Sequence, residues 1–289
     1  MAEEFSPGDL IRVREALLQA AEDGSVPAGP LGNRVELLLH LLGPELCRRI
    51  GIFHIPPDFK LSVVIPVYNE VKTIEKVLAR VRATKIPCEM VIVDDGSRDG
   101  TRDLLAQLRD GGDPINHDLK IVFHEKNAGK GAALKTGFAH CTGDVVVVQD
   151  ADMEYDPQDF RLLLQPLIEQ RADVVYGSRF SHNDGPVLSY WHQWGNQLIT
   201  KLSNWKSGRT LTDVETCYKM MRRELIQQIA PSLRERGFGI ELELTFKLAR
   251  LPGVRFFERP ISYAGRSYAE GKKIGWRDGV WAMWCILRY

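Results

Sequence analysis

Two aspartates stand one residue apart, directly after the valine run 145–148. A buried strand that ends in Asp150 and Asp152 brings two like charges to the rim of a sheet, where they are costly unless something neutralises them. A divalent cation bound by oxygen ligands does so and leaves positions open for phosphate oxygens; Mg²⁺ or Mn²⁺ suits such a set. The sequence therefore predicts a metal site at Asp150 and Asp152, with Glu154 as a third oxygen donor. The alternative is an acidic surface turn.

A second acidic pair follows another apolar run. Residues 90–93 lead into Asp94 and Asp95, and Gly96 then permits a tight turn. A carboxylate at such a point can bind a ribose hydroxyl or a base N–H, although Asp-Gly is also a common structural turn. The fingerprint GxGxxG is absent after the first apolar run, 61–67, which disfavours a dehydrogenase.

A glycine-rich motif, Asn-Ala-Gly-Lys-Gly at 127–131, opens a predicted helix. Backbone amides at a helix start, together with Lys130, can bind a phosphate. A tight packing turn explains the glycines equally well. The motif lacks the spacing of a Walker A sequence, so Lys130 is a candidate phosphate ligand without being a sign of an ATPase.

These motifs need elements that bring strand ends together. Strands are predicted at 61–67, 90–93, 120–123, 144–148 and 173–176, with shorter ones at 254–257 and 261–263. Helices are predicted near 70–83, 100–109, 129–140, 157–170 and 239–250. Apolar strands separated by helices predict an α/β fold: a mostly parallel sheet with helices on both faces. Ligands of such sheets bind at the carboxyl ends of the strands, where the motifs lie.

The N-terminal part of the chain has a different pattern. Residues 1–58 predict a helical extension that contains a helix at 35–42 and ends at two prolines. Residues 59–289 predict the α/β domain. The extension holds no cluster of polar residues that suggests chemistry.

Composition excludes some classes of protein. The chain has 289 residues, of which 44% are hydrophobic and 26% charged, as in ordinary globular proteins. Lys and Arg number 38, as do Asp and Glu, so a general nucleic-acid binder is not expected. The segment 247–289 carries nine basic and three acidic residues. That excess favours a phosphate-bearing ligand or a membrane surface over a plain solvated face only in combination with other signals.

Cysteine and tryptophan usage bears on location. Five dispersed cysteines without CxxC predict reduced thiols and a cytoplasmic protein, and no zinc spacing is present. No signal peptide or spanning segment is expected, because the longest apolar run, 280–287, is far shorter than the roughly 20 residues that a bilayer needs. All six tryptophans follow residue 190, near Lys and Arg. The tryptophans either belong to the core or contact lipid headgroups. In the second case the protein would be peripheral at the cytoplasmic face of the membrane.

Together the motifs resemble a known family. VVIPVYNE, VIVDDGSRDGT, NAGKGAAL, VVQDADMEYDP and VVYGSRF, in this order, are similar to family 2 glycosyltransferases of the Rossmann-like GT-A fold. The match covers about residues 60–289, with later segments such as LTDVETCYKMMRRE and ISYAGRSYAEGKKIGW. Within the family the chain resembles the dolichyl- and polyprenyl-phosphate mannose and glucose synthases. The resemblance implies inverting, metal-dependent transfer of a hexose from a nucleoside diphosphate sugar, such as UDP-glucose or GDP-mannose, to a polyprenyl or dolichyl phosphate.

The resemblance also implies roles for individual residues. The nucleotide pocket is matched by Pro66, Tyr68, Glu70 and Asp95, to which Asp94, Lys130 and Ala151 are added as substrate contacts. Asp150 and Asp152 match the metal site, and Glu154 stands where the mannose synthases carry a glutamine ligand. Arg179 matches an arginine associated with the acceptor phosphate. Donor phosphates are matched by the basic residues Arg266 and Lys272, with Lys273 beside them.

The carboxylates near the predicted site do not decide whether the acceptor is a hydroxyl or a phosphate. A sugar hydroxyl acceptor requires a general base, which Asp213 would supply, with its neighbour Glu215 as a weaker candidate. A phosphate acceptor is already anionic, so Asp213 would then orient groups beside Arg179. Glu241 either binds substrate or is a helix-start carboxylate favoured by the helix dipole.

The alternative functions are therefore transfer to a soluble hydroxyl acceptor and a non-catalytic nucleotide-sugar-binding module. The intact Asp150 and Asp152 pair argues against the module. Aspartyl phosphatase-like hydrolases also place D-x-D after a strand, but they place it after the first strand, whereas here it follows the fourth.

Overall fold

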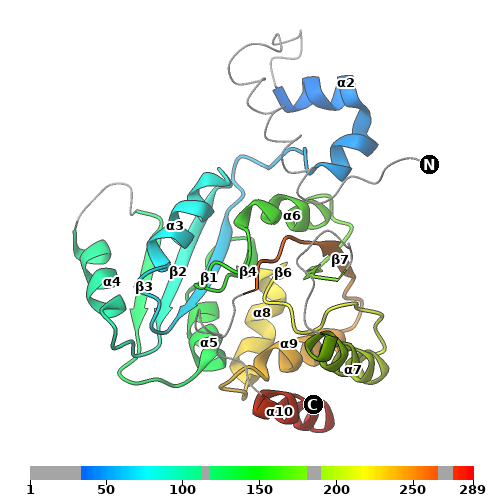
Figure 1. Ribbon diagram of the computed structural model, residues 1–289. Helices are drawn as coiled ribbons and strands as arrows, with labels where there is room; N and C mark the ends of the chain where they lie inside the picture. Colours follow the sequence, from blue (N-terminus) through cyan, green and yellow to red (C-terminus); the bar gives the residue numbers. More distant parts are fainter. Residues whose placement is uncertain (1–33, 112–116, 181–189, 266–275) are drawn as a thin grey trace.

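One seven-stranded sheet organises the chain (Figure 1). The computed structural model describes residues 34–111, 117–180, 190–265 and 276–289. The strands are β1 (Leu61–Val67), β2 (Cys88–Asp94), β3 (Leu119–Phe123), β4 (Val145–Val148), β5 (Val174–Ser178), β6 (Lys219–Arg222) and β7 (Phe256–Pro260). Their order is β3-β2-β1-β4-β6-β5-β7. All neighbours are parallel except β6, which is antiparallel to β4 and β5. The predicted mostly parallel sheet is confirmed.

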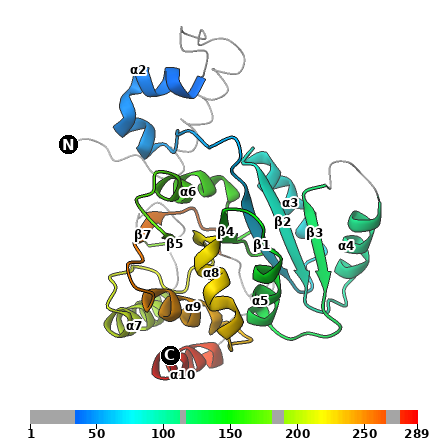
Figure 2. The same ribbon diagram turned by 180° about the vertical axis from the view of Figure 1, so that it is seen from behind.

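Helices cover both faces of this sheet. They are α2 (Arg34–Arg49), α3 (Ile74–Ala83), α4 (Thr101–Asp110), α5 (Lys130–His140), α6 (Phe160–Ile168), α7 (Tyr190–Ser207), α8 (Arg223–Ile229), α9 (Ile240–Ala249) and α10 (Trp276–Arg288). Helix α3 lies on one face, and α5 and α8 lie on the other (Figures 1 and 2). Gly137 of α5 sits so close to β1 that a Cβ there would come within 2.4 Å of Val64. Glycine at this position lets α5 pack tightly against the strands.

The central strands are apolar because both faces are covered. Every residue of β4 is buried, and Leu61, Val63, Val64 and Ile65 of β1 are fully buried. Burial on both faces explains why these strands read as continuous apolar runs rather than as alternating patterns.

The structure corrects the predicted elements in three places. Strand β6 and helix α8 were not predicted. The charged residue Lys219 interrupts the apolar pattern by which a buried strand is recognised. The short strand predicted at 254–257 is found with shifted bounds as β7, Phe256–Pro260, whereas the strand predicted at 261–263 is wrong. Pro260 cannot donate to a further ladder bond, and beyond it Tyr263 forms only an isolated bridge with Tyr155.

Helix α2 represents the N-terminal extension in the described residues. It kinks at Gly43, whose φ of 77° is open to glycine, just before Pro44. Its buried residues Leu38 and Cys47 form a small cluster with Ile50 and Ile52, separate from the main core. Residues 1–33 lie outside the described structure, and the domain boundary at residue 58 stays a prediction.

The C-terminal helix α10 is fastened to the sheet domain by one buried carboxylate, Glu235. Trp281 Nε1 donates to it at 2.8 Å, and the Tyr289 hydroxyl donates to it at 2.7 Å. The carbonyl of the next residue, Arg236, accepts the Gly131 N–H of α5 at 2.7 Å. The same short segment therefore holds α10 on one side and the start of α5 on the other.

Candidate functional site

The strand ends meet at one edge of the sheet. Strands β1, β2, β4 and β5 all end there, and β6 begins there because it is antiparallel to its two neighbours. Register pairs Val67 with Asp94, and Tyr176 with Lys219. The polar segments after these strands are thus brought side by side, as the sequence predicted.

A line of four alternating charges, which we name the charge chain, lies at this edge. Asp150 Oδ1 is 2.8 Å from Lys130 Nζ, which is also 3.0 Å from Glu241 Oε1. The other oxygen of Glu241, Oε2, is 2.8 Å from Lys219 Nζ. The chain joins the segment after β4, the start of α5, the start of α9 and the first residue of β6.

Burial makes the pairing within the charge chain strong. Burial alone would lower the pKa of Lys130, but the Asp150 and Glu241 carboxylates outweigh it and hold that pKa well above its ordinary value. Lys130 is therefore a permanent cation at the sheet edge. A half-buried cation of this kind suits an anionic ligand such as a phosphate.

The predicted metal ligands lie near one another without converging. Asp150 faces Lys130, while Asp152 Oδ1 accepts the backbone N–H of Glu154 at 3.2 Å. Glu154 Oε2 accepts the Tyr263 hydroxyl at 3.0 Å. Among the described side chains, no three His, Cys, Asp or Glu groups are gathered as a metal cluster. Mg²⁺ commonly binds one or two carboxylates plus phosphate oxygens and waters, so the all-oxygen pair of Asp150 and Asp152 still fits such an ion.

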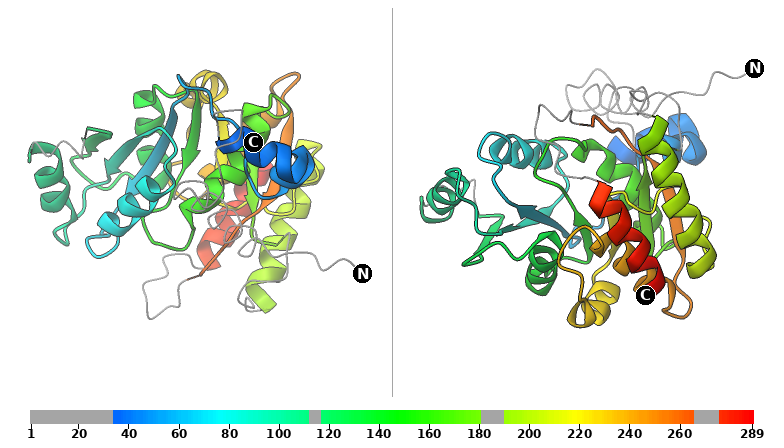
Figure 3. Two further views of the ribbon diagram at one scale, coloured as in Figure 1. Left: turned by 90° about the horizontal axis from the view of Figure 1, so that it is seen from above. Right: turned by 60° about the horizontal axis from the view of Figure 1, so that its bottom comes forward.

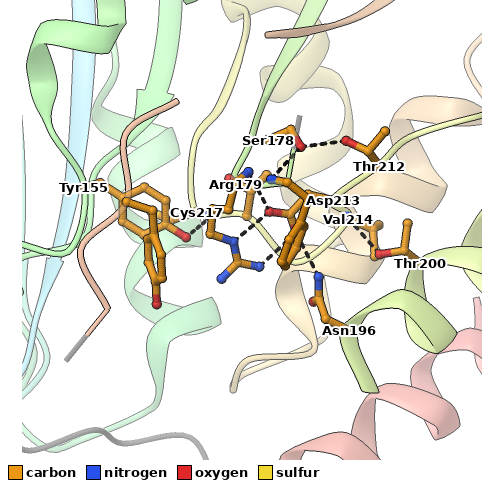
Figure 4. A network of polar contacts seen from close by, with 12 residues as sticks. Tyr155, Ser178, Arg179, Asn196, Thr200, Thr212, Asp213, Val214 and Cys217 are labelled. Carbon is orange, nitrogen blue, oxygen red and sulfur yellow. Dashed lines mark hydrogen bonds and ion pairs between the residues drawn. The ribbon is translucent and has the colours of Figure 1, made fainter. Parts of the chain in front are cut away.

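The second charged group at this edge is the Arg179–Asp213 pair (Figure 4). Arg179 Nε and Nη2 donate to the two carboxylate oxygens at 2.6 and 2.8 Å, and the Arg179 backbone N–H donates at 3.2 Å. Asn196 Nδ2 adds a longer contact of 3.4 Å. Burial would raise the pKa of Asp213, but Arg179 outweighs it and holds the pKa below its usual range. Asp213 is a buried anion held in a two-pronged ion pair.

Other groups surround the Arg179–Asp213 pair. The Arg179 guanidinium lies 5.2 Å from the centre of the Tyr263 ring, so Tyr263 contacts both this pair and Glu154. Glu258 accepts the backbone N–H of Asp213 at 3.1 Å. Burial raises the pKa of the Glu215 carboxyl to about 7. Glu215 is thus a carboxyl that can change charge near neutral pH.

Asp95 and the glycine-rich motif bind each other. Asp95 accepts the N–H groups of Ala128 and Gly129 at 2.9 and 2.7 Å, and His124 Nδ1 lies 2.7 Å from it. A Cβ at Gly129 would come within 2.3 Å of the Arg236 carbonyl, so this motif is a close packing turn. Its amides at 128, 129 and 131 already have protein partners. The side chain of Lys130 is therefore the group of this motif that could contact a ligand.

The remaining predicted positions have varied surroundings. Asp94 is fully buried and pairs with Arg102 Nη1 at 3.3 Å. Pro66 and Tyr68 are partly buried at the end of β1, while Glu70 is buried and accepts the Thr73 hydroxyl at 2.7 Å. Ala151 is buried between the two aspartates. The predicted phosphate ligands Arg266, Lys272 and Lys273 lie outside the described residues.

Sequence reasoning missed Lys219 and Tyr263. Lys219 is a lone lysine in the otherwise apolar segment Cys217-Tyr218-Lys219-Met220-Met221, and a single charge in a buried strand is a signal of an internal ion pair. Tyr263 gave no such signal, because its partners Glu154 and Arg179 are distant in the sequence.

Helices α7 and α10, which lie side by side (Figure 3), carry many exposed apolar side chains, which we name the apolar surface of α7 and α10. Trp205 is 84% exposed and Leu287 is 75% exposed. Other exposed apolar side chains on these two helices are Trp194, Leu198, Val280, Trp281, Met283 and Trp284. The described part of the chain has no helix of the length and apolarity needed to span a bilayer.

Known proteins show what the chain is similar to. A sequence model of "Glycosyl transferase family 2" matches residues 62–230. Undecaprenyl-phosphate mannosyltransferase of Micrococcus luteus is 30% identical over 75% of this chain and 88% of the relative. Undecaprenyl-phosphate 4-deoxy-4-formamido-L-arabinose transferase of Pseudomonas syringae is 33% identical over 63% of this chain. The chain spans about half, 52%, of that second relative.

Solved structures agree on the fold. Glucosyl-3-phosphoglycerate synthase from Mycobacterium tuberculosis, in complex with Mg²⁺ and UDP, matches with a TM-score of 0.55 at 21% identity, over 81% of this chain and 85% of that one. The same enzyme with Mn²⁺, UDP and phosphoglyceric acid matches with a TM-score of 0.52, over 75% and 79%. With its mostly parallel sheet and its matching family motifs, the chain belongs to glycosyl transferase family 2 and has the GT-A fold.

Proposed function

We propose that the protein transfers a hexose from a nucleoside diphosphate sugar to a polyprenyl phosphate, with inversion at the anomeric carbon. Family membership and two relatives named as undecaprenyl-phosphate sugar transferases support the reaction class. The observation that carries the proposal is the sheet edge, which holds two separate cations: Lys130, paired with Asp150 and the buried Glu241, and Arg179, paired with the buried Asp213. Two cationic positions suit a reaction in which both donor and acceptor carry phosphate.

The donor diphosphate would bind beside the charge chain. Asp150 and Asp152 are the residues that would hold Mg²⁺ or Mn²⁺, and the relatives' folds were solved with these ions and UDP. Such an ion supplies Lewis-acid neutralisation of the charge that grows on the diphosphate as the glycosidic bond breaks. Lys130 adds a fixed positive charge from the protein itself. Glu154 accepts the Tyr263 hydroxyl through Oε2, so its other oxygen, Oε1, is the one that would join the ligands.

The acceptor phosphate would bind beside Arg179. One phosphate oxygen attacks the anomeric carbon, and the bond from that carbon to the donor's diphosphate oxygen breaks. No proton has to be removed, since the attacking oxygen is already anionic. Asp213 has both carboxylate oxygens bound to Arg179, so it is placed to orient the guanidinium rather than to deprotonate a hydroxyl. This geometry favours a phosphate acceptor over a soluble hydroxyl acceptor.

The exposed surface of α7 and α10 would rest on a membrane that holds the lipid acceptor. Exposed tryptophans next to Lys201 and Arg288 are typical of headgroup contact, and helix α7 contains no acidic residue. All five cysteines are free, which suits a reducing compartment and the cytoplasmic face of the membrane.

Product formation tests the proposal. The purified protein is incubated with Mn²⁺, labelled UDP-glucose or GDP-mannose, and either a short-chain polyprenyl phosphate or the corresponding free alcohol. We expect labelled product only from the phosphate. If the protein ignores the phosphate and glycosylates a hydroxyl instead, the acceptor assignment is wrong.

A further inference from the structure

Lys219 is a fully buried charge that the proposed reaction does not use. It lies between buried Tyr218 and Met220 as the first residue of β6, and its side chain is 0% exposed. An isolated ammonium in such a place is strongly unfavourable unless it is paired and hydrogen-bonded. Its presence in a strand core therefore calls for a role that an apolar residue could not fill.

The Lys219 ammonium has three close oxygen partners within the protein. It contacts Glu241 Oε2 at 2.8 Å, the Val214 carbonyl at 3.0 Å, and the Thr216 carbonyl. The two backbone carbonyls accept hydrogen bonds from the ammonium and the Glu241 carboxylate adds an ion pair, and together these partners fix its position. Lys219 thus ties the turn that follows Asp213 to the start of α9.

Glu241 links this fixed point to the sheet edge. One of its oxygens is held by Lys219, and the other is 3.0 Å from Lys130 Nζ. Lys130 has a second carboxylate partner in Asp150. When Asp150 serves a metal ion, Glu241 is the partner that remains to hold Lys130 in place.

We infer that Lys219 is a positioning residue for the donor diphosphate. It fixes Glu241, and Glu241 keeps the Lys130 ammonium at the sheet edge where the diphosphate binds. The inference rests on the proposed function, because it takes the donor diphosphate as the anion that Lys130 meets. Lys219 itself touches no substrate and acts only through Glu241 and Lys130.

A double-mutant cycle on the full-length protein tests the inference. Binding of UDP and of GDP is measured by calorimetry at saturating Mn²⁺ for Lys130→Met, Lys219→Met and the double variant. We expect Lys219→Met to weaken binding about tenfold, as removal of a supporting residue behind a ligand-binding group commonly does. The double variant should bind no more weakly than Lys130→Met alone, because the two residues act as one unit. Binding of uridine or guanosine, which lack the diphosphate, should not change.

Lys247→Met is the matched control. Lys247 pairs at 2.8 Å with Glu243, a second buried carboxylate of the same helix α9, and has no contact with the charge chain. The Lys247→Met substitution removes one lysine charge and one ion pair with a buried glutamate, as Lys219→Met does. Nucleotide binding by Lys247→Met should match that of the parent.

Two results would overturn the inference. One is a folded Lys219→Met variant that binds the nucleoside diphosphate as tightly as the parent. The other is a double variant whose loss equals the product of the two single losses, as a general effect of charge would give. If Lys219→Met does not fold, Glu241→Gln replaces it and must show the same loss. A parent that binds neither UDP nor GDP contradicts the proposed function itself, a result distinct from either of these.

Discussion

Two buried carboxylate clusters lie at opposite ends of the same strands and differ in what holds them. At the amino ends, Glu89 of β2 accepts hydrogen bonds from Ser62 Oγ at 2.6 Å, from Thr142 Oγ1 at 2.7 Å and from the Gly143 N–H at 3.2 Å. Lys120 Nζ adds an ion pair of 2.7 Å from the surface. Most of the hydrogen bonds that the Glu89 carboxylate accepts therefore come from neutral hydroxyl and backbone N–H groups.

At the carboxyl ends the main partners of the acidic groups are side-chain cations. Asp150 is held by the Lys130 ammonium, and Asp213 by the Arg179 guanidinium. A side-chain cation can turn toward a phosphate, whereas a backbone N–H cannot. Both clusters include a cation, and they differ in how many neutral hydrogen-bond donors accompany it: Glu89 has several, whereas Asp150 and Asp213 rely mainly on Lys130 and Arg179.

The largest expected difference between the two ends is in turnover. Asp152→Ala should lower sugar transfer by at least about a hundredfold, the scale of losing one major charge-stabilising group, while thermal stability stays near that of the parent. Initial rates with labelled donor measure this. Near-normal activity of the variant, or full activity in excess chelator, would contradict the metal assignment.

Substitution of Arg179 should affect sugar transfer more than hydrolysis of the donor. Arg179→Ala is expected to lower transfer to a polyprenyl phosphate about tenfold or more beyond any loss in donor hydrolysis, since a charge-assisted contact to the acceptor is lost. Asp213→Asn should keep measurable transfer, because a phosphate acceptor needs no base. Rates of hydrolysis and transfer are compared on the same preparations. Abolished transfer in Asp213→Asn, together with glycosylation of a hydroxyl, would make Asp213 the base.

Glu89→Gln should affect stability and leave activity alone. The variant loses the charge that strengthens the hydrogen bonds donated by Ser62, Thr142 and Gly143, which should cost about 2 kcal/mol, measured as the free energy of unfolding in urea. Burial would raise the pKa of Glu89, but Lys120, Ser62 and Thr142 hold it well below the ordinary value of 4.5. Its stabilising contribution is therefore complete above pH 4.5 and is lost as the pH falls below that value. A large loss of kcat in this variant would contradict the assignment of Glu89 to a purely structural role.

Glu215 should show the opposite pH dependence. Burial raises its pKa from 4.5 to about 7, so the folded state favours its neutral form. Its burial costs nothing below pH 4.5, costs more as the pH rises toward 7, and is constant above that. Relative to Glu215→Gln, the parent should lose about 1–2 kcal/mol across this window, allowing for solvent screening. Parallel Tm curves for the two proteins between pH 4 and 8 would refute the assignment.

The sequence predicted the parts of the fold that local patterns encode. The strands β1 to β5 and the helices between them follow from apolar runs and helical spacing, and Asp150 was found because it directly follows a valine run. Lys219 and β6 were missed because a lysine in a strand is interpretable only once its partner Glu241 is known. The same is true of Tyr263, whose contacts join residues more than eighty positions away. The role of Asp95 as the partner of the glycine-rich turn also depended on a contact between distant segments.

The Glu235–Arg236 segment has a geometric consequence. The Glu235 side chain bonds to Trp281 and Tyr289, and the Arg236 carbonyl bonds to the start of α5, so one short segment links the exposed apolar side chains of α10 to the helix that carries Lys130. If the proposed membrane contact holds, this link would set how far the reacting edge lies from the bilayer, and acceptors would be discriminated by how far their headgroups extend into water.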